Sequence, residues 1–169
     1  MDKNTRQNPT RSDRPQFHPE YGIDRANIAG MLPWDWVEER MTTSRNYWIC
    51  TSSPEGLPHA APVWGVWLDG TFLFGTNPLS RKGRNLSVDP RVVVHLESGD
   101  EVVVFEGVLE ELTDPLIFER MAAAYESKYG GFRPVYGQKN TAYFRLLPQT
   151  AYAWRESDFL NSAARWHFD

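Results

Sequence analysis

The 169-residue sequence contains a single cysteine, Cys50, so no disulfide can form within the chain. A lone cysteine is typical of reducing compartments, and we expect a cytoplasmic protein. Cys50 lies in a strand-like run, where a buried thiol without a catalytic role is the expected state. No metal site is predicted, because no metal-ligand spacing involves the four histidines, which are His18, His59, His95 and His167.

The chain also lacks an excess of positive charge and lacks a long apolar run. Its net charge is −4 at pH 7 and its pI is near 5.6. Nucleic-acid-binding surfaces are positive, so a nucleic-acid partner is not expected. No run approaches the roughly 20 apolar residues of a membrane span, and we do not expect the polar N-terminus to be a signal peptide. We therefore expect no membrane partner.

The composition otherwise suits one folded domain. Hydrophobic residues make up 41% of the chain and charged residues 24%, as in ordinary soluble proteins. Seven tryptophans are unusual for one small domain, and such residues fill cores and interfaces or stack on planar ligands. Residues 1–20 are polar and contain proline, which predicts a flexible tail, or an arm that orders only on a partner. A single domain over residues 21–169 would follow.

Turn signals divide that domain into strands and a few helices. Helices are expected at 32–41, after Ser80, and from 115 to about 129. Strands are expected over residues 45–53, 58–68, 71–75, 91–97, 101–112, 141–147 and 150–156. Most neighbouring strands are joined by short turns such as Asp69-Gly70, whereas parallel pairs need long crossovers. The pattern favours a mainly β (α+β) fold, an antiparallel barrel with two or three flanking helices.

The most informative segment runs from Phe74 to Leu86. It reads as a strand, a turn and a short helix with Ser80 at the N-cap, followed by the cations Arg81, Lys82 and Arg84. A helix N-terminus disfavours each cation by about 0.3–1 kcal/mol, and a bound anion would reverse that sign. Backbone N–H groups, hydroxyls and cations would then converge on one phosphate. The alternative is a solvated basic turn.

Four motifs in order resemble the pyridoxamine 5′-phosphate oxidase-like superfamily. They are His59-Ala60-Ala61-Pro62-Val63-Trp64-Gly65-Val66-Trp67, Phe74-Gly75-Thr76-Asn77, Ser80-Arg81-Lys82-x-x-Asn85-Leu86 and Asp89-Pro90-Arg91-Val92. The resemblance covers roughly residues 33–155, and the ordered series is more specific than any one motif. It implies a split β-barrel that binds FMN, or the deazaflavin coenzyme F420, at a homodimer interface.

The resemblance also implies which residues hold the phosphate of the cofactor. Ser80, Arg81 and Lys82 resemble the phosphate-binding turn of the family, and Thr76 would add its hydroxyl or amide. Lys82 and Arg84 would serve the single phosphate of FMN, or the phosphodiester and acidic tail of F420. The choice of cofactor stays open at this point.

Further residues are implied at the ring of the cofactor and at the C-terminus. The segment Ala61-Pro62-Val63-Trp64 resembles the strand whose backbone lies along the isoalloxazine edge. Gly65, in the same strand, indicates either a close approach of a ring or a bulge where the barrel bends. Arg165 and Trp166 would either fold over the cofactor of the partner subunit or anchor the end of the chain.

Two departures argue against pyridoxamine phosphate as the substrate. The C-terminus lacks the Arg-Leu-His-Asp-Arg segment of the true oxidases, and Val102-Val103-Val104 stands where they place a glutamine. We expect a homodimeric flavin-dependent oxidoreductase that transfers a hydride or electrons to a small organic substrate, with no catalytic side chain identified. The alternatives are an F420H2-dependent reductase of the same fold and a non-catalytic flavin-binding protein.

Overall fold

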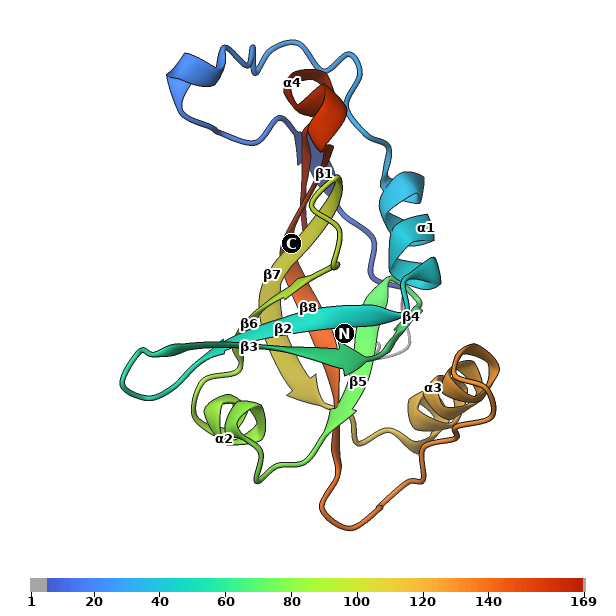
Figure 1. Cartoon of the computed structure of the whole chain (residues 1–169). Coiled ribbons are helices and arrows are strands. Elements are labelled where there is room, and N and C mark those ends of the chain that lie inside the picture. Colours follow the sequence, from blue (N-terminus) through green and yellow to red (C-terminus); the bar gives the residue numbers. More distant parts are fainter. Residues whose placement is uncertain (1–5, 169) are drawn as a thin grey trace.

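The computed structural model describes residues 6–168, which form one nine-stranded antiparallel sheet with helices around it (Figure 1). The strands are β1 (Arg11–Asp13), β2 (Asn46–Ser52), β3 (Pro58–Trp64), β4 (Val66–Leu68), β5 (Thr71–Thr76), β6 (Arg91–His95), β7 (Glu101–Glu111), β8 (Ala142–Arg155) and β9 (Ala164–His167). The helices are α1 (Trp34–Thr43), α2 (Arg81–Val88), α3 (Pro115–Lys128) and α4 (Phe159–Ser162), with 3-10 turns η1 (Pro19–Tyr21) and η2 (Glu156–Asp158). No helix in this range is long and apolar enough to cross a membrane.

Strand β8 belongs to two parts of the sheet at once. Along one edge it pairs with β7 from Phe144 to Arg155. Along the other edge its first residues pair with β5, from Ala142 opposite Thr76, and its last residues pair with β9. The sheet therefore branches at β8, with the order β1-β9-β8-β7-β6-β2-β3 on one path and β4-β5 beside it. This branching confirms the predicted antiparallel split β-barrel and the mainly β fold.

Several local predictions are confirmed because short-range chemistry decides them. Asp69 and Gly70 have φ values of 52° and 75°, the positive values that a tight hairpin turn requires between β4 and β5. Asp114 caps α3, since its carboxylate accepts the N–H groups of Leu116 and Ile117. Such signals depend only on residues that are close in the sequence.

The predicted strands at 141–147 and 150–156 are one continuous strand, β8, and that prediction was wrong. Pro148 lies inside β8, opposite a register shift between Glu106 and Gly107 of β7. An added Cβ at Gly107 would lie only 2.3 Å from the Leu147 carbonyl oxygen, so the two backbones approach closely there. Pro148 has no N–H to donate to β7, and a bulge is a position where a strand tolerates proline. The strand therefore continues past Pro148 without a break.

Two clusters of apolar side chains form the core. The larger cluster fills the barrel beneath α1 and includes Met41, Tyr47, Phe72 and Phe105, all with 0% exposure. The smaller cluster lies beneath α3 and includes Leu73, Phe118, Met121 and Tyr125. Burial of large apolar side chains is the main source of stability in such a domain.

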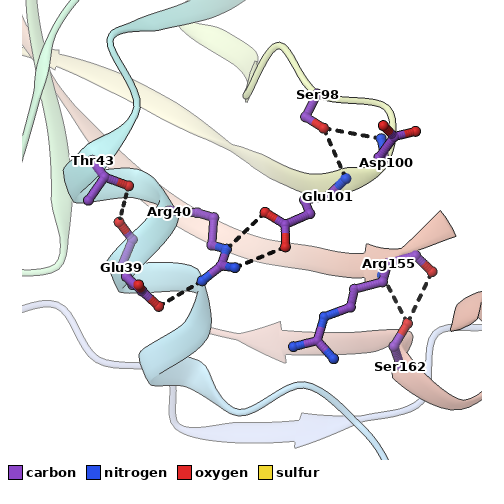
Figure 2. A network of polar contacts seen from close by, with 8 residues as sticks. All are labelled: Glu39, Arg40, Thr43, Ser98, Asp100, Glu101, Arg155 and Ser162. Atoms are coloured by element: carbon purple, nitrogen blue, oxygen red, sulfur yellow. Dashed lines mark hydrogen bonds and ion pairs between the residues drawn. The ribbon is translucent and has the colours of Figure 1, made fainter. Parts of the chain in front are cut away.

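An ion-pair network ties α1 to the start of β7 (Figure 2). The Arg40 guanidinium donates to Glu101 at 2.9 Å and to Glu39 at 2.7 Å, and it lies 4.3 Å from the centre of the Trp36 ring. The hydrogen bond from Arg40 lowers the pKa of the Glu101 carboxyl, and Glu101 in turn raises the pKa of Arg40. Beside this network, Ser162 bonds to the backbone of Arg155.

The N-terminal segment differs from the expected flexible tail over residues 1–20, of which residues 1–5 lie outside the described range. Arg11–Asp13 form strand β1, which pairs with β9 of the same chain. Arg14 is only 2% exposed. Its guanidinium donates to five backbone carbonyls, those of Asn27, Ala29, Leu160, Asn161 and Ala163. One buried cation therefore joins the N-terminal segment to the turn around α4.

Replacing Arg14 tests this role. We expect Arg14→Met to lower the free energy of unfolding by roughly 3 kcal/mol or more, because each buried carbonyl left unpaired costs about 1–3 kcal/mol. Urea unfolding measures the change. Arg11→Met is the control, since Arg11 is exposed and lies 3.8 Å from its nearest carboxylate oxygen. Equal unfolding midpoints for the two variants would contradict the role of Arg14.

The pairing of β1 with β9 predicts a specific loss of stability in acid. Arg165 donates to both oxygens of Asp13 at 2.7 Å, and this bond lowers the pKa of the carboxyl from 3.8 to about 2. A lowered folded-state pKa gives stability that is present above about pH 4 and is lost as the pH falls towards 2. The difference in Tm between the protein and Asp13→Asn should therefore shrink across that window. A difference that stays constant down to pH 2 would show that Asp13 does not titrate as described.

Candidate functional site

The candidate site starts where β5 ends at Thr76 and α2 begins at Arg81. Ser80 is the N-cap of α2, as predicted, and its hydroxyl accepts the Gly83 N–H at 3.0 Å. An added Cβ at Gly83 would lie 2.4 Å from the Asn77 carbonyl oxygen, so only glycine allows this contact. The first turn of α2 is thus held directly against the turn that leaves β5. We call this region, residues 76–84, the cationic corner.

Three predicted phosphate-binding side chains meet in the cationic corner. Thr76 is only 7% exposed, and its hydroxyl lies 3.3 Å from that of Ser80. The Lys82 ammonium donates to the Thr76 hydroxyl at 3.1 Å. Two hydroxyls and one ammonium therefore converge beside the free N–H groups of the helix start, which is a donor set suited to a phosphate.

The cations of the corner have no carboxylate partner among residues 6–168. None of the ion pairs in this range includes Arg81, Lys82 or Arg84. Burial lowers the pKa of the Lys82 amine, so its charge is held at a cost in the absence of a counter-ion. Arg84 donates instead to the Leu79 carbonyl of the same turn. A bound anion would remove this electrostatic penalty.

Strand β3 starts beside the cationic corner. The pKa of His59 is lowered first by burial and then by the positive charges of Arg81 and Lys82, so the charges of the corner act on the start of β3. From His59, β3 extends for five residues to Trp64, a length of roughly 17 Å. Ala61 and Pro62 lie on this stretch, with Ala61 opposite Ile49 and Pro62 opposite Trp48 of β2.

At the other end of β3 lies an open pocket of about 510 Å³. Val63 and Trp64 of β3 line it together with Thr76 of the cationic corner, so the corner and the pocket are continuous. The opposite wall comes from α3, the loop after it and the start of β8, and includes the aromatic residues Tyr125, Phe132 and Tyr143. We call it the aromatic pocket. Its volume suits an organic ligand, for which sites of about 300–1,000 Å³ are usual.

Trp64 and Phe132 form the exposed part of the aromatic wall. The Trp64 indole is stacked on the Tyr129 ring at 4.5 Å with an interplanar angle of 10°, and it meets the edge of Phe132 at 5.8 Å. It remains 42% exposed. A large aromatic side chain that is partly exposed in this way provides a flat surface on which a planar ligand can stack. Trp64 is among the residues predicted from the sequence, whereas the aromatic residues of α3 and its loop are not.

Packing within the chain itself explains why residue 65 is a glycine. A Cβ there would lie 2.2 Å from the Phe72 ring and 2.9 Å from the Leu73 carbonyl oxygen. The strand predicted over 58–68 breaks at this residue into β3 and β4. The packing of Phe72 in the core therefore requires glycine, and neither a cofactor ring nor a bulge is needed to explain it.

Arg165 and Trp166 lie far from the cationic corner within this chain. Arg165 pairs with Tyr152 of β8, whereas Thr76 pairs with Ala142, and these two β8 residues are separated by roughly 33 Å of strand. The Arg165 guanidinium is bound to Asp13. Trp166 is 3% exposed and packs in the barrel core. Their arrangement corresponds to the anchoring alternative of the sequence analysis.

Comparison with known proteins agrees with the geometry. Residues 34–155 match the family model described as pyridoxamine 5′-phosphate oxidase. The search of curated proteins gave no match.

Among solved structures, a conserved hypothetical protein from Mycobacterium tuberculosis is 26% identical, with a TM-score of 0.63 over 74% of this chain and 86% of that one. A FAD-binding protein from Mesorhizobium loti is 19% identical, with a TM-score of 0.58 over 80% and 95% of the two chains. A structure described as an F420 reductase is 19% identical, with a TM-score of 0.54 over 67% and 94%. Since the family match spans most of the barrel and the sheet branches as expected for that fold, this chain belongs to the pyridoxamine 5′-phosphate oxidase family.

Proposed function

We propose that this protein is a flavin-dependent oxidoreductase that binds FMN, with the phosphate at the cationic corner and the ring against the aromatic pocket. The observation that carries this proposal is the meeting of two features at Thr76. On one side lie three cations without carboxylate partners in the described chain, and on the other lies a pocket of about 510 Å³ with aromatic walls. A phosphorylated planar molecule has the matching charge and shape.

The edge of β3 supports the placement of the ring. Among residues 6–168, β3 is the last strand of its path in the sheet and pairs only with β2, so its outer edge carries backbone groups without a strand partner. Such an edge presents N–H and C=O groups in alternation, except at Pro62, which has no N–H. These groups would bind the polar edge of an isoalloxazine and tune its reduction potential.

When bound, FMN supplies the hydride or electron-pair chemistry at its N5–C4a region. The chain supplies binding and orientation: Ser80, Arg81 and Lys82 neutralise the phosphate, and Trp64 covers the ring and excludes water from it. The substrate would be a small organic molecule that reaches the ring. The departures from the true oxidases at 102–104 and at the C-terminus favour a substrate other than pyridoxamine phosphate.

A homodimer is part of this proposal. Leu79, before α2, is 71% exposed, Val88, the last residue of α2, is 62% exposed, and Leu57 of the β2–β3 hairpin is 57% exposed. Apolar residues of this size grouped near a binding site are typical of an interface. A second copy of the chain that covers them would also cover the cationic corner.

F420 is the second candidate cofactor. The corner offers three cations, more than a single phosphate needs, and F420 has a phosphodiester with an acidic tail. One solved structure of the same fold is described as an F420 reductase. The two cofactors are distinguished by their absorbance and mass after purification.

The first test removes two charges of the corner. Arg81→Ala with Lys82→Ala should weaken FMN binding by several kcal/mol, because each charge-assisted hydrogen bond contributes about 1.5–3 kcal/mol. Quenching of flavin fluorescence measures the affinity. Arg91→Ala is a matched control, since Arg91 is an exposed cation near α2 that is already paired with Asp89 at 2.6 Å. An unchanged affinity in the double variant would overturn the phosphate assignment.

The second test separates an enzyme from a binding protein. We expect the purified protein to carry FMN or to take it up, and the bound flavin to be reduced by a nicotinamide donor and reoxidised by an added organic acceptor under anaerobic conditions. Absorbance of the flavin band follows both steps. A bound flavin that is neither reduced nor reoxidised by any donor and acceptor pair would favour a non-catalytic flavin-binding protein. A protein that takes up only F420 would favour the reductase alternative.

A further inference from the structure

Three side chains of α3 and its C-cap hold the break between β3 and β4. The Tyr125 hydroxyl donates to the Trp64 carbonyl at 2.8 Å. The Lys128 ammonium donates to the Gly65 carbonyl at 3.1 Å, and the Tyr129 hydroxyl accepts the Gly65 N–H at 2.9 Å. Residues spaced by three and four positions lie on one face of a helix, so α3 presents all three to the break. The backbone that carries the Trp64 indole is thus fixed by α3.

Lys128 is the charged member of this group, and it is partly buried. Its ammonium also donates to the Tyr47 hydroxyl at 2.6 Å. It lies 4.7 Å from the centre of the Tyr47 ring and 5.5 Å from that of Tyr129. No carboxylate among residues 6–168 forms an ion pair with it. Its charge is balanced by ring faces and oxygen dipoles alone.

The other ionisable groups around Lys128 keep their charge state near neutral pH. Burial raises the pKa values of Tyr47 on β2, and of Tyr125 and Tyr129 on the α3 side. Arg45, immediately before β2, is a fixed positive charge 5.7 Å from the Tyr129 ring. Burial lowers the pKa of Lys128 from 10.5 to about 8. Lys128 is therefore the group of this cluster that changes charge in mildly alkaline solution.

We propose that Lys128 is a positioning residue that makes ligand binding in the aromatic pocket depend on pH. Its ammonium holds the Gly65 carbonyl, and through it the Trp64 indole, in the arrangement that a planar ligand meets. Loss of the proton removes the charge-assisted bond and the attraction to two ring faces, which leaves Trp64 less firmly placed. The inference rests on the proposed function for the identity of the ligand, but not for the behaviour of the unliganded protein.

Unfolding does not account for the expected loss of binding. A lysine whose pKa is lowered on folding binds fewer protons in the folded state than in the unfolded state between about pH 8 and 10.5. Over that range its titration raises the free energy of unfolding as the pH rises. Weaker binding above pH 8 would therefore accompany an unchanged or more stable fold.

The test is a titration with FMN between about pH 6.5 and about pH 9.5. The affinity of the protein should fall about tenfold with a midpoint near pH 8, as expected for loss of one charge-assisted bond. Lys128→Met should bind weakly throughout without a transition, whereas Lys128→Arg should keep the charge and lose the transition. Lys139→Met is the matched control, because Lys139 lines the same pocket and its removal should leave the midpoint in place. A protein whose affinity does not change with pH, or Lys128→Met with the transition intact, would overturn the proposal.

A second readout needs no ligand. The tryptophan emission of the protein minus that of Trp64→Phe reports on Trp64, and it should change near pH 8 in the protein but not in Lys128→Arg. If FMN fails to bind while this emission titrates, the proposed function fails and the role of Lys128 stands. If FMN binds while affinity and emission are both independent of pH, the role of Lys128 fails and the proposed function stands. If Lys128→Met does not fold, Lys128→Arg is the deciding variant. Loss of the pH transition in Lys128→Arg would support the proposal, and an intact transition would overturn it.

Discussion

The close contact between the first turn of α2 and the turn after β5 is the constraint on which the candidate site depends. Gly83 leaves no room for a Cβ against Asn77, and Ser80 caps the helix at the same point. As a result, the Lys82 side chain does not extend into solvent, and its ammonium donates to the Thr76 hydroxyl at the end of β5. Since Thr76 pairs with β8, the orientation of the helix start is fixed by the barrel itself. Local turn geometry and long-range strand pairing thus meet at one residue.

Strand β8 separates two regions with different tasks. Its first four residues pair with β5, which leads into the cationic corner, and Tyr143 among them lines the aromatic pocket. Its second half pairs with β9, where the Arg165–Asp13 pair and the buried Arg14 hold the N-terminal segment and the α4 turn. In Figure 1, α2 and α4 lie at opposite ends of the molecule accordingly. The C-terminal arginine and tryptophan therefore pack at one end of the barrel, and the proposed ligand site lies at the other end.

Sequence reasoning succeeded where neighbours in the chain decide the structure and failed where distant residues meet. The Ser80 cap, the Asp69-Gly70 turn and the Asp114 cap depend on side chains within a few residues. In contrast, β1 has only three residues, and its pairing with β9, across more than a hundred residues, makes it a strand. The opposite wall of the pocket was missed for the same reason, since Tyr125 and Phe132 are far from Trp64 in the sequence. The spacing of Tyr125, Lys128 and Tyr129 was the available signal, but it reads equally well as a core-facing helix stripe.

The central claim is that the cationic corner and the aromatic pocket together bind one phosphorylated planar molecule. A crystal structure of the protein with FMN tests it most directly. The account predicts phosphate oxygens within hydrogen-bond distance of the Ser80 hydroxyl and the Lys82 ammonium, with the ring along β3 and against Trp64. A phosphate bound elsewhere, such as near Arg165 within one chain, with the cationic corner open to solvent, would contradict it.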